Sequence, residues 1–236
     1  MRRRKVRREL IVEHSPQSIY AEQYRTLRNN IYFSNIDKKL KVIQITSSVP
    51  SEGKTTTICN LAVVFAQNDK KILIIDADLR KPTVHKKFLI SNDKGLSNIV
   101  VGESTFEEVV QKDIYPGVDA ITSGPIPPNP SELLHSEGFI KILETHKNEY
   151  DFILIDSPPV APISDAKSIA QHSNGIVFVC DISKTSGESI KIAKKELEKV
   201  NKNILGVVCN KLSKKNQNRY NYYQYQYQYE YKEGNS

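Results

Sequence analysis

Residues 47–56 read Ser47-Ser48-Val49-Pro50-Ser51-Glu52-Gly53-Lys54-Thr55-Thr56. They follow a short apolar run and open a stretch with helical spacing, so they form the turn between a strand and a helix. At such a turn, backbone N–H groups and the helix dipole favour phosphate, a lysine reaches its outer oxygens, and a hydroxyl coordinates Mg²⁺. The segment predicts a phosphate-binding loop. Its contributing residues are Ser51, Glu52, Gly53, Lys54, Thr55 and Thr56, although Ser48 replaces the first glycine of G-x-x-x-x-G-K-[ST].

Apolar runs recur along the chain and alternate with helical patterns. The runs are short and rich in β-branched residues, as in strands buried on both faces of a parallel sheet. They lie at 42–45, 72–75, 152–155, 176–179 and 204–208, with a weaker strand at 118–122. Helices are expected near 54–68, 137–148, 164–172 and 184–201. This alternation predicts an α/β fold of the P-loop NTPase kind, with a doubly wound, mostly parallel sheet flanked by helices.

The flanking segments divide the 236 residues into three parts. We expect a basic arm at 1–14, one P-loop domain at 15–212 and a flexible tail at 213–236. The domain opens with a helix over 15–33, for which Ser15 is the expected N-cap and Pro16 lies in the first turn. The proline-rich stretch 125–130 is expected to form an extended loop. The tail lacks aliphatic residues and is low in complexity, which is typical of a mobile segment.

The net charge of +7 comes mainly from the first eight residues, six of which are Arg or Lys. The rest of the chain is close to neutral, which argues against a nucleic-acid partner. The arm could contact anionic lipid or serve as a solubilising tail. No apolar run approaches the ~20 residues that span a bilayer, and no secretory signal follows the basic residues. We therefore expect a cytoplasmic protein whose membrane association is peripheral.

Three aspartates follow expected strands. Asp76 and Asp78 end the run Ile72-Leu73-Ile74-Ile75, and Asp156 ends Phe152-Ile153-Leu154-Ile155. In open α/β sheets, ligands bind at the carboxyl ends of the strands, where the phosphate-binding loop also lies. We expect the three carboxylates to meet near a bound Mg²⁺ ion, because unpaired they would repel one another. The alternative is that they cap helices.

Four segments together resemble the bacterial tyrosine kinases (BY-kinases) that are encoded with capsule and exopolysaccharide assembly machinery. They are Gly53-Lys54-Thr55, Asp76-Ala-Asp78-Leu-Arg80-Lys81-Pro82, Gly124-Pro-Ile-Pro-Pro-Asn-Pro-Ser-Glu-Leu133 and Asp156-Ser-Pro-Pro159. The resemblance runs from about residue 15 to the end. It is to the stand-alone cytoplasmic form, in which the kinase is separate from its membrane activator. No His-Arg-Asp or Asp-Phe-Gly pattern of the eukaryotic-type kinases is present.

The resemblance implies a role for each matched residue. Asp76 and Asp156 would serve Mg²⁺ with Thr55, Lys54 would neutralise phosphate charge, and Asp78 would be the catalytic base facing a tyrosine hydroxyl. Asn210 resembles an asparagine that contacts the base of ATP. Three residues of the first helix match an E-x-x-R-x-x-R oligomerisation motif, namely Glu22, Arg25 and Arg28. Without the resemblance, a local Glu–Arg pair would explain their spacing equally.

Seven of the twelve tyrosines lie in the tail: Tyr220, Tyr222, Tyr223, Tyr225, Tyr227, Tyr229 and Tyr231. The resemblance implies that they are phosphoacceptors, modified in trans within a homo-oligomeric ring. A flexible chain of some twenty residues spans on the order of 25 Å, enough to reach a closely packed neighbour. An ordered tyrosine-faced strand or an aggregation-prone tract would be the alternative.

The resemblance also implies partners, and two rival functions remain open. The partners are a membrane activator of the polysaccharide co-polymerase type, an opposing tyrosine phosphatase and further protein substrates. One rival is a partitioning or cell-division ATPase, although those proteins carry a second lysine early in the loop. The other is a non-catalytic module that binds ATP for assembly and docks through its tyrosine tract.

Overall fold

The computed structural model describes residues 10–35, 40–161, 164–201 and 203–212. The tail tyrosines and the basic residues of the arm lie outside these ranges. Among the described residues, no helix combines the length and the apolar character needed to cross a membrane.

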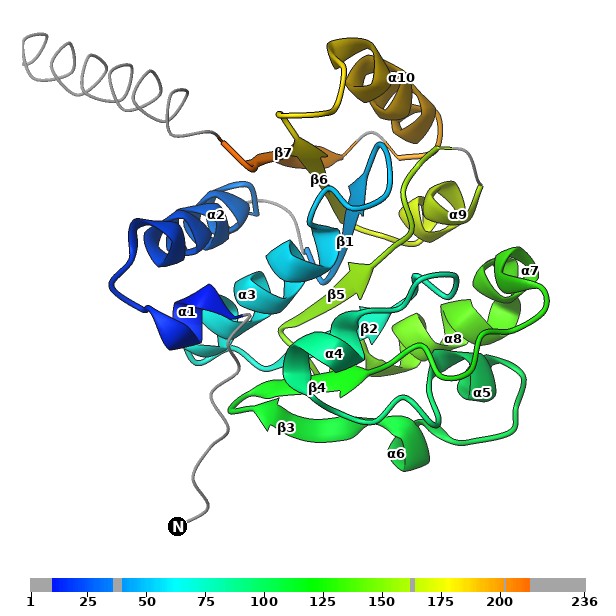
Figure 1. Cartoon of the computed structure of the whole chain (residues 1–236). Helices are drawn as coiled ribbons and strands as arrows, with labels where there is room; N and C mark the ends of the chain where they lie inside the picture. Colours follow the sequence, from blue (N-terminus) through cyan, green and yellow to red (C-terminus); the bar gives the residue numbers. More distant parts are fainter. Residues whose placement is uncertain (1–9, 36–39, 162–163, 202, 213–236) are drawn as a thin grey trace, which may run out of the picture.

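The centre of the molecule is a sheet whose strands follow the order β3-β4-β2-β5-β1-β6-β7 (Figure 1). Its strands are β1 Val42–Ser47, β2 Ile72–Asp76, β3 Gln111–Tyr115, β4 Val118–Ile121, β5 Phe152–Asp156, β6 Gly175–Asp181 and β7 Ile204–Asn210. All neighbouring strands pair in parallel except β3 and β4. The predicted α/β fold with a mostly parallel sheet is confirmed, and the antiparallel edge strand β3 was not predicted.

Helices cover both faces of the sheet. They are α1 Ile11–His14, α2 Ile19–Phe33, α3 Lys54–Ala66, α4 Val84–Phe88, α5 Leu96–Val100, α6 Phe106–Val109, α7 Pro130–His135, α8 Glu137–His146, α9 Asp165–Gln171 and α10 Gly187–Glu198. In Figure 1, α1, α2 and α3 lie together on one side, and α7, α8, α9 and α10 lie on the other.

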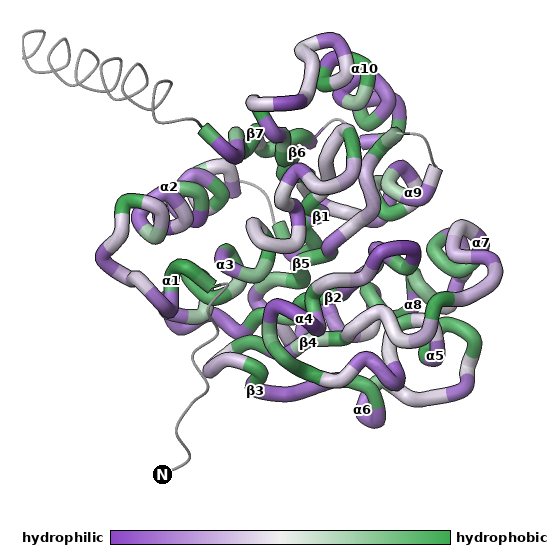
Figure 2. The backbone as a smooth tube through the Cα atoms, viewed as in Figure 1, coloured by the Kyte–Doolittle hydropathy of each residue, from purple (hydrophilic) through white to green (hydrophobic). Residues whose placement is uncertain are grey.

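Successive strand residues divide the core between the two faces, because side chains alternate along a strand. Ile43 and Ile45 of β1 pack in the same cluster as α1, α2 and α3, whereas Ile153 and Ile155 of β5 pack with α8. Figure 2 accordingly shows hydrophobic residues along the central strands and mixed colours along α2 and α10. With both faces covered, the carboxyl ends of the strands are the edge of the sheet at which a ligand can bind.

Three boundaries differ from the sequence prediction. The N-cap of the long first helix is Ser18, whose side chain accepts a hydrogen bond from the Ala21 N–H, so the prediction of Ser15 was wrong. Before it, Leu10 and Val12 are fully buried against the core, within the segment assigned to the arm. The stretch 125–130 is not all loop, because Pro130 is the first residue of α7. Proline is accepted there since the first N–H of a helix needs no partner within the helix.

Candidate active site

The phosphate-binding loop joins β1 to α3, as predicted, and Gly53 is the N-cap of that helix. The φ of Gly53 is +101°, and a Cβ at this position would lie 2.4 Å from Asn210 Nδ2. Both the backbone conformation and the close approach therefore require glycine. The backbone of Ser51 also lies in the left-handed region, with φ +68°. Its backbone is held by Lys211, whose Nζ donates to the Ser51 carbonyl at 2.9 Å.

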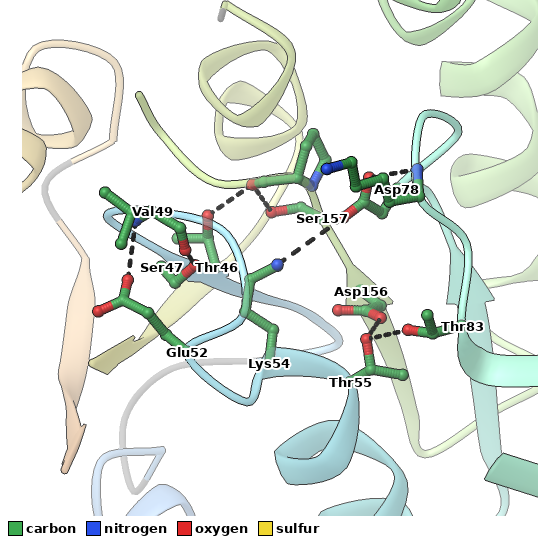
Figure 3. A network of polar contacts seen from close by, with 12 residues as sticks. Thr46, Ser47, Val49, Glu52, Lys54, Thr55, Asp78, Thr83, Asp156 and Ser157 are labelled. Carbon is green, nitrogen blue, oxygen red and sulfur yellow. Dashed lines mark hydrogen bonds and ion pairs between the residues drawn. The ribbon is translucent and has the colours of Figure 1, made fainter. Parts of the chain in front are cut away.

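Lys54 and Thr55 begin α3 and face acids from two other strand ends (Figure 3). Lys54 Nζ lies 3.7 Å from Asp78 Oδ2, and both side chains are nearly buried. Thr55 Oγ1 donates to Asp156 Oδ2 at 2.5 Å and accepts from Thr83 Oγ1 at 2.7 Å. The structure therefore brings together the lysine, the hydroxyl and two of the acids that the sequence placed at one site. Thr83, which no sequence pattern indicated, joins them through its hydroxyl.

Asp76 lies at the end of β2 and is fully buried. One of its oxygens accepts hydrogen bonds from the N–H groups of Thr83 and Val84, at 3.1 and 3.0 Å. Burial and the adjacent Asp156 carboxylate raise the pKa of Asp76 well above its usual value. Burial likewise raises the pKa of Asp156 to about 6, although Lys54 and the hydrogen bond from Thr55 oppose the rise.

These acids fit a divalent cation. Asp156 Oδ1 is buried and has no hydrogen-bond partner among the described residues, so a ligand position is free there. Asp76 and the Thr55 hydroxyl supply further oxygens, and a cation would reverse the raised pKa values. Within the described ranges, no group of three or more His, Cys, Asp or Glu is arranged to hold a metal. Such a group is not needed for Mg²⁺, which proteins usually bind through one or two carboxylates, with water and substrate phosphates as the other ligands.

Glu52 is a residue of the loop, and Asn210 lies against the loop backbone. Asn210 Nδ2 donates to the Glu52 carbonyl at 3.0 Å and approaches Thr57 Oγ1 at 3.4 Å. The Glu52 carboxylate is buried and occupied by hydrogen bonds from within the protein. Glu52 can therefore offer phosphate its backbone N–H, and its side chain serves another purpose.

Arg80 connects the loop after β2 to the opposite helical layer. Its Nε donates to Asp165 Oδ2 at 3.0 Å, and one Nη donates to Ser131 Oγ at 3.0 Å. Asp165 is fully buried and also accepts from Ser131 at 2.5 Å. The Arg80 and Ser131 segments, which carried the family resemblance, are thus joined through one buried carboxylate.

The residues of the E-x-x-R-x-x-R motif make contacts within the chain. Arg25 pairs with Glu22 at 2.9 Å and donates to the Pro16 carbonyl at 2.8 Å. Arg28 donates to the Val64 carbonyl of α3 at 3.0 Å. The local pair left open by the sequence is therefore present, and the role of these residues between subunits stays a prediction.

Known proteins are similar to this chain in sequence and in fold. A family described as "AAA domain" matches residues 40–208. The tyrosine-protein kinase YwqD of Bacillus subtilis is 43% identical over 212 residues, which cover 89% of this chain and 90% of YwqD. The chain belongs to the bacterial tyrosine-protein kinases. It is a tyrosine-protein kinase with a nucleotide-binding P-loop domain, and the match along nearly the whole of YwqD agrees with the stand-alone form.

Solved structures of this family have the same fold. The chimerical protein CapA2B2 is 38% identical with a TM-score of 0.81, and covers 86% of this chain and 89% of its own. The kinase domain of Escherichia coli ETK is 33% identical with a TM-score of 0.84, over 87% of this chain and 80% of that domain. The septum site-determining protein MinD of Pyrococcus horikoshii, at 22% identity, covers 72% of this chain and 69% of its own with a TM-score of 0.61, and shares the fold alone.

Proposed function

We propose that this kinase transfers the γ-phosphoryl group of ATP to tyrosines of its own C-terminal tail, with Mg²⁺ at Thr55, Asp76 and Asp156. The observation that carries the proposal is the ion pair between Lys54 and Asp78, which lies beside the hydrogen bond between Thr55 and Asp156. A switch ATPase or a scaffold needs a phosphate loop and a cation site. A kinase additionally needs a carboxylate beside the phosphate-binding lysine, because the hydroxyl that accepts the phosphoryl group must give up its proton.

In this mechanism, Asp78 accepts the proton of the acceptor phenol. The phenol oxygen forms the new P–O bond as the bond between the γ-phosphorus and the ADP oxygen breaks. A phenol has a pKa near ~10 and enters protonated, so a carboxylate within reach orients it and takes the proton late in the transfer. Lys54 and the N–H groups of residues 51–56 hold the phosphates in place. When bound, Mg²⁺ would be held by Thr55, Asp76 and Asp156 and would neutralise charge on the phosphates.

The acceptors are the seven tail tyrosines, reached in trans within a homo-oligomer that Glu22, Arg25 and Arg28 help to assemble. The resemblance supports this, and so does the basic, aliphatic-poor tail that could extend to a neighbouring site. It also supports an activator of the polysaccharide co-polymerase type, an opposing phosphatase, further protein substrates and a role in capsule or exopolysaccharide synthesis and export. The kinase would then work in the cytoplasm at the inner face of the membrane.

A mixing experiment tests the transfer between subunits. One chain carries Lys54→Ala with its tail intact, and the other is active but has all seven tail tyrosines changed to Phe. We expect phosphotyrosine on the tail of the Lys54→Ala chain only when both chains are incubated with ATP, Mg²⁺ and a candidate activator segment. If wild-type chains become phosphorylated under these conditions but the mixture does not, transfer occurs within one chain.

A further inference from the structure

Glu52 places a carboxylate inside the phosphate-binding loop, where a negative charge would oppose a triphosphate. The side chain is only 1% exposed. Figure 3 shows it on the side of the loop away from Thr55, Asp156 and Thr83. A buried carboxylate turned away from the ligand must have another purpose, because burying a charge is costly unless it is hydrogen-bonded.

Four hydrogen bonds converge on this carboxylate from two parts of the chain. Within the loop, Ser48 Oγ and the Val49 N–H each donate to Oε2 at 2.8 Å. The N–H of Asp181, the last residue of β6, donates to Oε1 at 3.0 Å, and the hydroxyl of Thr185, in the connection between β6 and α10, donates to the same oxygen. Burial alone would raise the pKa of Glu52, but these four donors lower it below its ordinary value. The carboxylate is therefore held in its charged form.

The loop is tied to the same region at two further points. The Glu52 carbonyl accepts from Asn210 at the end of β7, and the Ser51 carbonyl accepts from Lys211. Lys211 also pairs with Asp181 at 2.7 Å. Consecutive loop residues are thus bound to the ends of β6 and β7, and the Glu52 carboxylate makes the largest number of these bonds.

We propose that Glu52 is a positioning residue for ATP: its carboxylate fixes the loop in the shape that binds phosphate by joining Ser48 and Val49 to Asp181 and Thr185. The proposal rests on the proposed ATP site. It assigns the side chain of Glu52 no contact with the nucleotide. It also makes the β6–α10 connection, through Thr185, part of the apparatus that shapes the loop.

Replacement by glutamine distinguishes positioning from electrostatics. Glu52→Gln removes a negative charge beside the phosphates, so an electrostatic role predicts tighter ATP binding. Positioning predicts weaker binding, because the amide NH₂ would face groups that are themselves donors. We expect the affinity for Mg²⁺–ATP to fall about tenfold or more, measured by isothermal titration calorimetry. Unchanged or tighter binding would overturn the proposal.

Two further variants separate positioning from general loss of stability. Asp119 lies on β4, three strands from β1, and its buried carboxylate accepts hydrogen bonds from the Tyr150 hydroxyl and from the Asp113 N–H of β3. Asp119→Asn removes this carboxylate. It should lower the melting temperature but leave the ATP affinity unchanged. Thr185→Val removes one donor with little change of shape. It should raise the KM for ATP about threefold or more while kcat stays within about twofold, in proportion to one lost hydrogen bond.

The two proposals fail differently. If the wild-type protein does not bind ATP, the proposed function fails. If it binds ATP, but Glu52→Gln binds ATP with wild-type or higher affinity, only the positioning role is wrong. Should Glu52→Gln not fold, the KM of Thr185→Val decides, because that variant keeps the carboxylate and its other three bonds.

Discussion

At the scale of one residue, Gly53 shows how the backbone conformation of the loop determines which amino acid it carries. Its φ of +101° is rarely adopted by other residues, and an added Cβ would meet the Asn210 amide at 2.4 Å. Gly53→Ala should therefore weaken ATP binding at least tenfold and cost roughly 1–3 kcal/mol of stability, measured by calorimetry and urea unfolding. The matched control is Gly187→Ala, since a Cβ at Gly187 meets no atom within 4 Å. Equal effects of the two changes would contradict this account of the loop.

Asp156 gives the site a pH dependence. Its pKa is raised to about 6, so without Mg²⁺ the folded protein binds a proton there at a pH where the unfolded chain does not. At this site, stability without Mg²⁺ should therefore rise as the pH falls from 8 through 6. Asp156→Asn should be more stable than the wild type at pH 8 in EDTA, by roughly 1–3 kcal/mol, with the difference shrinking below pH 6.

Thermal melting at several pH values, with EDTA or with Mg²⁺ and ATP, checks this prediction. Added Mg²⁺ and ATP should stabilise the wild type and should stabilise Asp156→Asn far less. If the melting temperature of the wild-type protein in EDTA fell steadily between pH 8 and pH 6, the pKa values of Asp76 and Asp156 would not be raised as described.

At the scale of elements, strands and helices with a strong apolar pattern could be predicted from the sequence, and short elements without such a pattern could not. The apolar runs of β1, β2, β5 and β6 and the pattern of α3 have ends that carry the loop and the acids, so the sequence predicted that Lys54, Thr55, Asp78 and Asp156 lie close together, and their roles stay predictions. The fifth run, at 204–208, was expected to be buried on both faces, but β7 is an edge strand that is only half-buried. The edge strand β3 was missed because its residues are mostly polar and a register shift interrupts its pairing with β4. The contacts of Glu52 and Thr83 were missed because they depend on tertiary structure.

The N-terminal segment is the element that the sequence divided wrongly. Leu10 is fully buried, and the Val12 N–H donates to Asn60 Oδ1 on α3, so this segment is part of the fold. Leu10→Ala should reduce the free energy of unfolding by about 2–5 kcal/mol, as for other buried leucines. Ile19→Ala is the control, because Ile19 is 51% exposed and should change stability little. Urea unfolding that showed no loss for Leu10→Ala would place residue 10 outside the core.

At the scale of the whole molecule, we expect phosphorylation to control assembly by changing the charge of the tail. Residues 213–236 carry four basic and two acidic side chains, a net charge of +2. Each phosphotyrosine adds roughly −1.5 to −2 charges, so modified tails crowded in a ring would repel one another. We expect phosphorylated protein to form smaller assemblies than phosphatase-treated protein in size-exclusion chromatography with light scattering. Identical masses for the two forms would contradict this switch.

In the proposed mechanism, Asp78 is the residue that distinguishes this kinase from a protein that only binds ATP. The decisive measurement compares wild-type protein and Asp78→Asn in ATP affinity and in phosphotyrosine formed with Mg²⁺, ATP and a candidate activator segment. The account predicts that Asp78→Asn still binds ATP but forms phosphotyrosine at least a hundredfold more slowly, as expected for loss of a general base. Phosphotyrosine formed at the wild-type rate by Asp78→Asn would contradict it.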